Sequence, residues 1–238
     1  MALPLYLAMT REEIDSYPLP AHFAFMACHF SAYGKGLQDL PTSLPSGCLL
    51  ILDDRIPVWN HDPKQVAEEL CEAVTRHGCC GLLLDFQRPG EPLMTDITRS
   101  IAETLPCPVA VTEAYAEGVG CAVLIGCPEV NEPLTKRCGP WQGREKWLEL
   151  ASQTLRYTIT QDCSRREVVD ETIQTYPHRD AVLCCSYRIE VEKDRAVFTL
   201  ERTAEDLLAL LRQAEELGFT RAVGLYQQLG NMAMTDDG

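Results

Sequence analysis

The sequence predicts an α/β fold, a (β/α)8 TIM-like barrel, on three observations. Short apolar segments alternate with amphipathic helical segments along most of the 238 residues, which is the rhythm of a parallel sheet. Eight segments qualify as barrel strands, the number that closes such a barrel. The glycine motifs that bind nucleotide phosphates, G-x-G-x-x-G and G-x-x-x-x-G-K-[ST], do not occur, which weakens the alternative of a doubly wound open sheet.

The first half of the chain supplies four of these strands. They are expected at Leu3–Met9, His22–Phe30, Cys48–Asp53 and Cys80–Phe86. The helix between the third and fourth strands has clear ends: Asp62 is its predicted N-cap and Pro63 its first residue. Gln65 completes a predicted capping box, and Gly78 ends the helix in a left-handed conformation. A further helix is predicted at Met94–Leu105.

The second half supplies the other four strands and an interruption. The strands are expected at Val109–Glu113, Ala122–Gly126, Lys146–Ala151 and Arg221–Gln227, where the third is open between a strand and a short helix. Residues 152–202 break the rhythm with strands at Leu155–Thr160, Ala181–Glu190 and Ala196–Leu200, the last two joined by a polar turn. We expect residues 1–238 to form one barrel domain, with 152–202 inserted as an antiparallel unit before the long helix from Thr203 to Gly218.

Charge and hydropathy exclude two classes of partner. The formal net charge of −14 repels the phosphates of nucleic acids and anionic lipids, so we expect neither as a partner. No apolar run reaches the ~18–20 residues that span a bilayer. The apolar start of the chain has no basic residue before it and no small-residue cleavage site after it, which argues against a signal peptide.

The 12 cysteines lie mostly within apolar segments. They form no C-x-x-C pair and no Cys/His set with the spacing of a zinc site. We therefore expect reduced thiols that serve as small core residues, a cytoplasmic location, and no metal or other cofactor.

Barrel enzymes carry their chemistry at the C-terminal ends of the strands. The sequence places polar residues at four of these ends: Asp53 and Asp54 at the third strand, Asp85 and Gln87 at the fourth, Glu113 and Tyr115 at the fifth, and Tyr226 and Gln227 at the eighth. We expect them to converge on one mouth. The alternative is that such acids cap helices or lie in solvated loops.

Alternation along the fourth strand makes Asp85 the strongest of these candidates. If Asp85 points into the barrel, then Leu83 and Gln87 do so too, and the apolar Leu82, Leu84 and Phe86 point toward the helices. A carboxylate held at the mouth of a barrel is partly desolvated, which raises its pKa.

Several aromatic side chains and one histidine could add to a ligand site. Flat rings that could stack on a sugar are Trp59, Tyr115, Trp141 and Tyr226. His29 ends the second strand and could reach the mouth. Each of these residues could equally be part of the core or of a loop.

The run from Cys80 to Gln87, CGLLLDFQ, resembles the fourth-strand signature of the family-18 glycoside hydrolases, the chitinase-like barrels, which reads D-G-x-D-x-D-x-E. Cys80 and Leu83 stand where the first and second Asp belong. Asp85 matches the third Asp, which in the family orients the acetamido group of the substrate. Gln87 stands where the family has its catalytic Glu. Many members also carry an α+β insertion after the seventh strand.

The resemblance implies that the ligand is an oligosaccharide or another small polar molecule. The mechanism depends on Gln87, which replaces the general acid of the family. An amide cannot give up a proton at neutral pH, and loss of a general acid costs about 10²–10⁴-fold in rate. Hydrolysis by the family route is therefore not expected. The Tyr-Asp pair of the family's sixth strand is also not visible near Leu124–Pro128.

Three functions stay open at this point. The first is a degenerate barrel that binds a glycan without cleaving it. The second is an active glycoside hydrolase with Asp85 and Glu113 as a new carboxylate pair, at a separation of about 5 Å for a retaining or about 6.5–9.5 Å for an inverting enzyme. The third is a non-catalytic interaction protein with a vestigial mouth. The sequence does not fix the oligomeric state.

Overall fold

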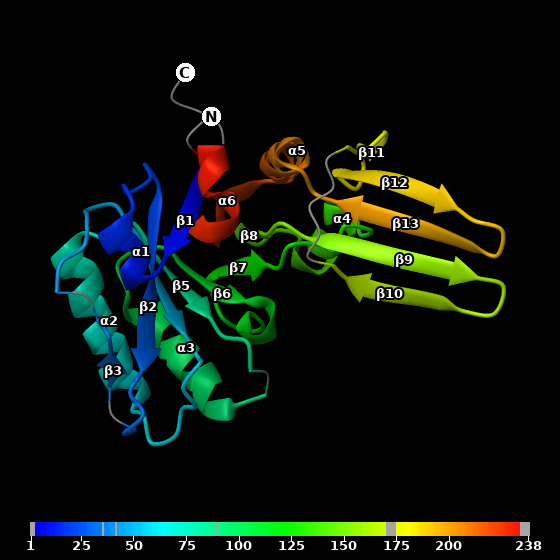
Figure 1. Ribbon diagram of the computed structural model, residues 1–238. Helices are drawn as coiled ribbons and strands as arrows, with labels where there is room; N and C mark the ends of the chain where they lie inside the picture. The colour runs from blue at the N-terminus through cyan, green and yellow to red at the C-terminus, as the bar shows by residue number, and fades with distance from the viewer. Residues whose placement is uncertain (1–2, 35, 41, 89, 170–174, 234–238) are drawn as a thin grey trace.

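The computed structural model describes residues 3–34, 36–40, 42–88, 90–169 and 175–233. Eight parallel strands form the predicted barrel (Figure 1), which closes because β1 pairs with both β2 and β14. In barrel order the strands are β1 (Leu5–Met9), β2 (Phe23–Phe30), β4 (Leu49–Asp53), β5 (Gly81–Asp85), β6 (Val109–Thr112), β7 (Ala122–Ile125), β8 (Lys146–Leu150) and β14 (Phe219–Leu225). The ambiguous segment Lys146–Ala151 is thus a strand.

The helical layer around the barrel is uneven. Three helices are long: α2 (Pro63–His77), α3 (Pro92–Thr104) and α5 (Ala204–Glu216). The others are short: α1 (Arg11–Ser16), α4 (Leu134–Cys138), α6 (Tyr226–Ala233) and the 3-10 turns η1 (Glu113–Tyr115) and η2 (Gly139–Trp141). After β2 the described chain forms a two-residue antiparallel strand, β3 (Leu37–Gln38), in place of a helix. In the described part of the chain, no helix is both long enough and apolar enough to cross a membrane.

The ends of α2 follow the sequence with one exception. Asp62 caps the helix by accepting from the backbone N–H of Lys64, and Gly78 ends it at φ +60°. The predicted capping box is wrong, because the amide of Gln65 donates to Oε1 of Glu69 on the next turn instead of reaching back to the cap. Thr203 caps α5 as predicted, with Asp206 completing a capping box.

Alternation along the strands separates two apolar layers, as predicted for the fourth strand. Leu83 belongs to the cluster that fills the barrel, with Ile51, Leu124 and the fully buried Trp147. Leu82, Leu84 and Phe86 belong instead to the larger cluster between the barrel wall and the helices. The barrel interior is therefore a packed core.

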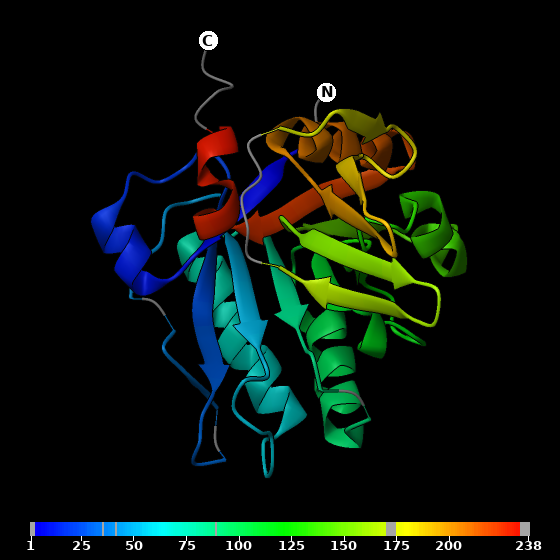
Figure 2. The same cartoon turned by 45° about the vertical axis from the view of Figure 1, so that its right-hand side comes forward.

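The inserted segment forms a separate antiparallel sheet, as expected, and it projects from the barrel (Figures 1 and 2). Its order is β10-β9-β13-β12-β11, with β9 (Thr154–Thr160), β10 (Ser164–Val168), β11 (His178–Asp180), β12 (Cys185–Val191) and β13 (Arg195–Glu201). The predicted strand at Ala181–Glu190 starts too early, because residues 181–184 form a turn. The predicted turn before Arg195 is confirmed.

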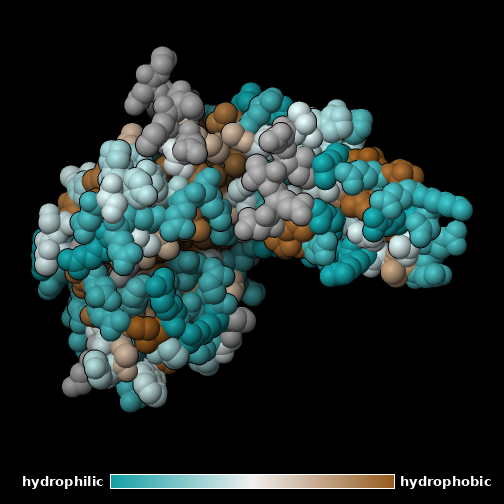
Figure 3. All heavy atoms as spheres, viewed as in Figure 1, coloured by the Kyte–Doolittle hydropathy of each residue, from teal (hydrophilic) through white to brown (hydrophobic). Residues whose placement is uncertain are grey.

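One face of the projecting sheet is apolar. The strand pairing places four exposed side chains on this same face: Ile159, Val168, Ile189 and Val191. Apolar surface on the projecting sheet is visible in Figure 3. The base of the sheet is anchored by the buried guanidinium of Arg202, which donates to the carbonyls of Pro128, Glu129 and Leu183.

Candidate functional site

A cavity of about 160 Å³ opens at the C-terminal ends of the barrel strands. Its apolar floor is the top of the barrel core: Ala8, Met26, Ile51, Leu83, Leu124 and Val223. Its polar side chains are Asp53, Asp85, Glu149 and Gln228. The structure thus brings two of the eight predicted site residues, Asp53 and Asp85, into one pocket, together with two that the sequence analysis did not single out.

Asp53 is a partnered carboxylate at one side of the pocket. It ends β4 directly opposite Asp85, which ends β5, so the strand register places the two acids side by side. Oδ1 of Asp53 lies 2.8 Å from Nδ1 of His29, and Oδ2 lies 3.1 Å from the guanidinium of Arg55. His29 therefore contributes by holding Asp53, and it is itself buried.

Asp85 has a different environment, because its hydrogen-bond partner is a neutral amide. Nε2 of Gln87 donates to Oδ1 of Asp85. Burial, followed by the charges of Asp53 and Asp54, raises the pKa of Asp85, while the hydrogen bond from Gln87 opposes the increase. The described chain forms no ion pair between Asp85 and a lysine or arginine, so this carboxyl can still accept hydrogen bonds from a polar ligand.

Glu149 lines the same pocket from β8. Burial and then the charge of Asp85 raise its pKa as well. The sequence contained a signal for it: in the segment KWLEL, period-2 alternation puts Glu149 on the face of Trp147, which fills the barrel. The signal was missed because this segment could also be a helix. Gln228, on α6, accepts from the backbone N–H of Ser152 at 3.2 Å and could not be found from strand periodicity.

Glu113, the proposed partner of Asp85, lies outside the residues that line the pocket. It begins η1 and accepts hydrogen bonds from the guanidinium of Arg137 and from Nε1 of Trp141, the latter at 3.0 Å. After burial, the charge of Asp85 and, to a smaller extent, that of Glu113 raise the pKa of Glu149.

Asp54 and Tyr115 hold the segment that carries Gln87. The buried Asp54 accepts from the backbone N–H of Gln87 at 3.1 Å and of Arg88 at 2.8 Å. The hydroxyl of Tyr115 donates to the carbonyl of Arg88, and its ring meets that of Phe86 edge-on. Both side chains therefore position the loop after β5, and neither is among the residues that line the pocket.

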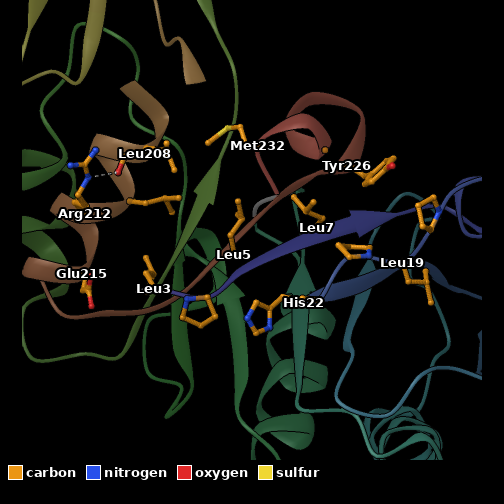
Figure 4. Close-up of a pocket in the computed structure, with 16 residues that line it drawn as sticks. Leu3, Leu5, Leu7, Leu19, His22, Leu208, Arg212, Glu215, Tyr226 and Met232 are labelled. Atoms are coloured by element: carbon orange, nitrogen blue, oxygen red, sulfur yellow. Dashed lines mark hydrogen bonds between the residues drawn. The ribbon is translucent and has the colours of Figure 1, made fainter. Parts of the chain in front are cut away.

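The prediction that Tyr226 and Gln227 end the eighth strand is wrong, because β14 stops at Leu225 and Tyr226 starts α6. The ring of Tyr226 packs on Tyr17 at 5.5 Å between centroids. It lines a groove of about 600 Å³ on the outer wall of the barrel, beside β1 and α5 (Figure 4). Gln227 is exposed.

The other expected groups do not reach the pocket either. Trp59 is 62% exposed, and Trp141 is bound to Glu113, so no aromatic ring is among the described residues that line the cavity. Across the described ranges, no three or more His, Cys, Asp or Glu side chains form a cluster suited to a metal ion. The chemistry available at the mouth is therefore that of carboxyl and amide groups above an apolar floor.

No protein-family model and no curated protein matches this sequence. Solved structures do match the fold. Two are of a family-18 chitinase from Cycas revoluta, a double mutant in complex with (GlcNAc)4 and a complex with allosamidin. Their TM-scores are 0.57 and 0.56, each at 9% identity over 98% of this chain and 97% of that chain.

The spore cortex-lytic enzyme SleL of Bacillus megaterium QM B1551 is also similar. Its TM-score is 0.54, at 9% identity over 93% of this chain and 70% of that chain. At this identity the similarity shows the fold alone: the chain has a barrel similar to those of these chitinase-like enzymes. The predicted (β/α)8 barrel with its antiparallel insertion is thereby confirmed.

Proposed function

We propose that the mouth of the barrel binds a soluble oligosaccharide, or a related small polar ligand, without cleaving it by the family-18 route. The observation that carries the proposal is the pair of Asp85 and Gln87, joined by a hydrogen bond at the mouth, with Asp85 lining a pocket that has an apolar floor. Pockets of this kind, mostly apolar with a few convergent polar groups, are typical of small-ligand sites.

The polar groups suit the hydroxyl and amide groups of a sugar. Carboxylates accept from sugar hydroxyls, and the amide of Gln228 can both donate and accept. Gln87 lies outside the residues that line the pocket and acts through its hydrogen bond to Asp85. The apolar floor suits the C–H face of a sugar ring. The fold supports this ligand class, because the Cycas revoluta chitinase of the same fold was solved with (GlcNAc)4.

Gln87 is the reason that we propose binding in place of hydrolysis. The family route requires a proton donor at this position, and an amide has no proton to give at neutral pH. The Gln87 amide is also occupied with Asp85, so its contribution is to orient the carboxylate. Asp54 and Tyr115 support this arrangement, because their side chains form hydrogen bonds with the backbone of residues 87 and 88.

A second function, hydrolysis by a different carboxyl pair, is favoured by one observation. Burial raises the pKa of both Asp85 and Glu149, and each lines the pocket, so one could stay protonated while the other is ionised. The earlier pair of Asp85 and Glu113 has less support, because Glu113 is already bound to Arg137 and Trp141. A third function, a non-catalytic interaction protein, would leave the pocket without a ligand.

The proposed site of action is the cytoplasm, because a chain with 12 cysteines stays reduced there. In that compartment a soluble oligosaccharide fragment is a more reasonable ligand than a polymer. The strongly acidic surface supports the further proposal that nucleic acid is not a partner.

A thermal-shift screen against soluble amino-sugar oligomers, with product analysis on the same samples, tests these functions together. The variants are Asp85→Ala, which removes the central carboxylate, and Tyr226→Ala, which alters a ring of similar burial on the outer wall. A ligand at 100 times its dissociation constant adds about 2.7 kcal/mol of stability.

Each result selects one function. A shift in the wild type and in Tyr226→Ala that is lost in Asp85→Ala, without product, supports binding without cleavage. Product that disappears in both Asp85→Asn and Glu149→Gln replaces the proposal with the second function. The absence of a shift with every oligomer contradicts sugar binding and favours the interaction protein.

A further inference from the structure

A group of thiols lies at the end of the barrel opposite the pocket. Three cysteines lie one or two residues before a strand: Cys48 before β4, Cys79 before β5 and Cys107 before β6. All three pack in the layer between the barrel and the helices. The carbohydrate site makes no use of these three cysteines, because none of them lines the pocket. This position is the N-terminal face of the barrel, where residues serve stability more than catalysis.

Two of these thiols are in contact. The Sγ atoms of Cys48 and Cys79 are 3.5 Å apart and share a hydrogen bond, although 31 positions separate them in the sequence. The backbone fixes the two segments against each other, because the N–H of Cys80 donates to the carbonyl of Cys48 at 2.8 Å and the N–H of Gly47 donates to that of Gly78 at 2.9 Å.

This geometry is close to that of a disulfide. A disulfide needs the sulfurs about 2.05 Å apart and Cα atoms that lie on adjacent segments of backbone. The register Leu49 to Gly81 places Cys79 one position before the residue opposite Cys48, on the neighbouring segment of backbone. The observation that carries the pair is therefore the contact of the two sulfurs at 3.5 Å, which must close to about 2.05 Å for a disulfide.

We propose that Cys48 and Cys79 form a reversible, modifiable thiol pair that closes to a disulfide when a small disulfide oxidant reaches it. The Cys48 thiolate attacks one sulfur of the oxidant RSSR, forming a mixed disulfide and releasing RS⁻. Cys79 loses its proton to water and attacks the Cys48 sulfur, releasing the second RS⁻. Two protein thiols are oxidised and one RSSR is reduced to two RSH, so the electrons balance.

The local chemistry distinguishes the two sulfurs. The hydrogen bond from Cys79 lowers the pKa of the Cys48 thiol, whereas the same bond and burial raise the pKa of Cys79. Cys48 is therefore the attacking thiol and Cys79 the resolving thiol. Both thiols are buried, with Cys48 2% and Cys79 9% exposed, so the oxidant reaches Cys48 only when this layer opens locally, and oxidation is expected to be slow.

The test is oxidation of the 238-residue protein with hydroxyethyl disulfide, followed by alkylation in denaturant and mass spectrometry. The proposal predicts a peptide cross-link between Cys48 and Cys79, separate from any mixed disulfide at the exposed Cys163, and recovery of the Cys48 and Cys79 thiols with dithiothreitol. The cross-link is lost in both Cys48→Ala and Cys79→Ala. It persists in Cys163→Ser, which removes the exposed cysteine of the projecting sheet.

The wild-type peptide map decides the outcome even if a variant fails to fold. A cross-link to Cys107 in place of Cys48 overturns the proposed pair. Full alkylation of Cys48 and Cys79 after the exposed Cys163 has been oxidised overturns the proposal itself. The pair and the carbohydrate site lie at opposite ends of the barrel, so oxidation is expected to leave ligand binding unchanged and to raise the Tm.

Discussion

The side-chain amide of Gln87 donates a hydrogen bond to the carboxylate of Asp85, at the mouth of the barrel. The two residues are two positions apart, and Gln87 occupies the place where the resembled signature has a proton donor. An amide has no proton to give at neutral pH, so the proposed function assigns the pair to recognition of polar groups on a ligand.

Removing the charge of Asp85 should stabilise the protein at neutral pH. Because the folded pKa of Asp85 is raised, its contribution to stability is present below the unfolded value of about 3.9 and is lost as the pH rises through the folded pKa. Asp85→Asn should therefore raise the Tm at pH 7 by about 2–4 °C, corresponding to about 1 kcal/mol. The difference should shrink near pH 4. A lower Tm for Asp85→Asn at pH 7 would contradict the desolvated carboxylate.

Loss of the buried guanidinium at the base of the projecting sheet should be strongly destabilising. Arg202 is 1% exposed and satisfies the carbonyls of Pro128, Glu129 and Leu183. Arg202→Met keeps an apolar stem but leaves these acceptors unpaired, at a cost on the order of 3 kcal/mol. Chemical denaturation measures the difference. Arg188→Met, at a partly exposed position on the same sheet, is the control and should cost less than half as much.

The roles of Tyr115 and Asp54 should separate stability from binding. Tyr115→Phe removes only the hydroxyl that donates to Arg88, and the loss should be about 1 kcal/mol. Asp54→Asn weakens two backbone hydrogen bonds and should cost about 1–2 kcal/mol. Affinity for a sugar oligomer should change by less than 3-fold in Tyr115→Phe, on the order of 0.6 kcal/mol. A 10-fold loss of affinity in a stable Tyr115→Phe would show that the tyrosine contacts ligand after all.

Substitution of Glu149, which the sequence analysis did not propose as a site residue, should weaken ligand binding. It lines the pocket beside Asp85, so Glu149→Gln should weaken the affinity for the oligomer about 5–10-fold, or about 1 kcal/mol. Glu113→Gln is the matched control, because Glu113 is outside the pocket lining and is bound to Arg137 and Trp141. Equal losses of affinity in the two variants would show that Glu149 does not contact the ligand.

The periodic parts of the fold could be predicted from the sequence. Period-2 alternation placed Asp85 and Leu83 inside the barrel. The N-cap residues Asp62 and Thr203 predicted where α2 and α5 begin. The local sequence is enough to predict these elements, because a long helix or strand that buries one face has a periodic pattern of apolar residues. Closure of the barrel followed from the number of strands.

The rest depended on contacts that no local pattern encodes. Gln65 has the spacing of a capping box, but a glutamate one turn later competes for its amide. Helix α1 does have the capping box of Thr10 and Glu13, yet its six residues contain no apolar stripe to reveal it. Tyr226 was assigned to the strand because the turn into α6 has no glycine or proline to mark it.

Tertiary contacts also explain why part of the candidate site could not be predicted from the sequence. Asp54 and Tyr115 are polar residues at strand ends, as the barrel rule requires, but tertiary contacts commit them to the backbone at 87 and 88. Their direction could not be read from spacing. Glu149 could have been found from alternation with Trp147, had the segment been assigned as a strand.

The central claim is that the mouth holds a carbohydrate around Asp85, and calorimetric titration with the tetramer (GlcNAc)4 tests it most directly. We expect a 1:1 binding isotherm for the wild type and for Tyr226→Ala, at least 10-fold weaker binding for Asp85→Ala, and no released sugar in the cell after the titration. Binding that is equally strong in Asp85→Ala, or weakened only in Tyr226→Ala, would place the ligand outside the mouth and refute the proposed site.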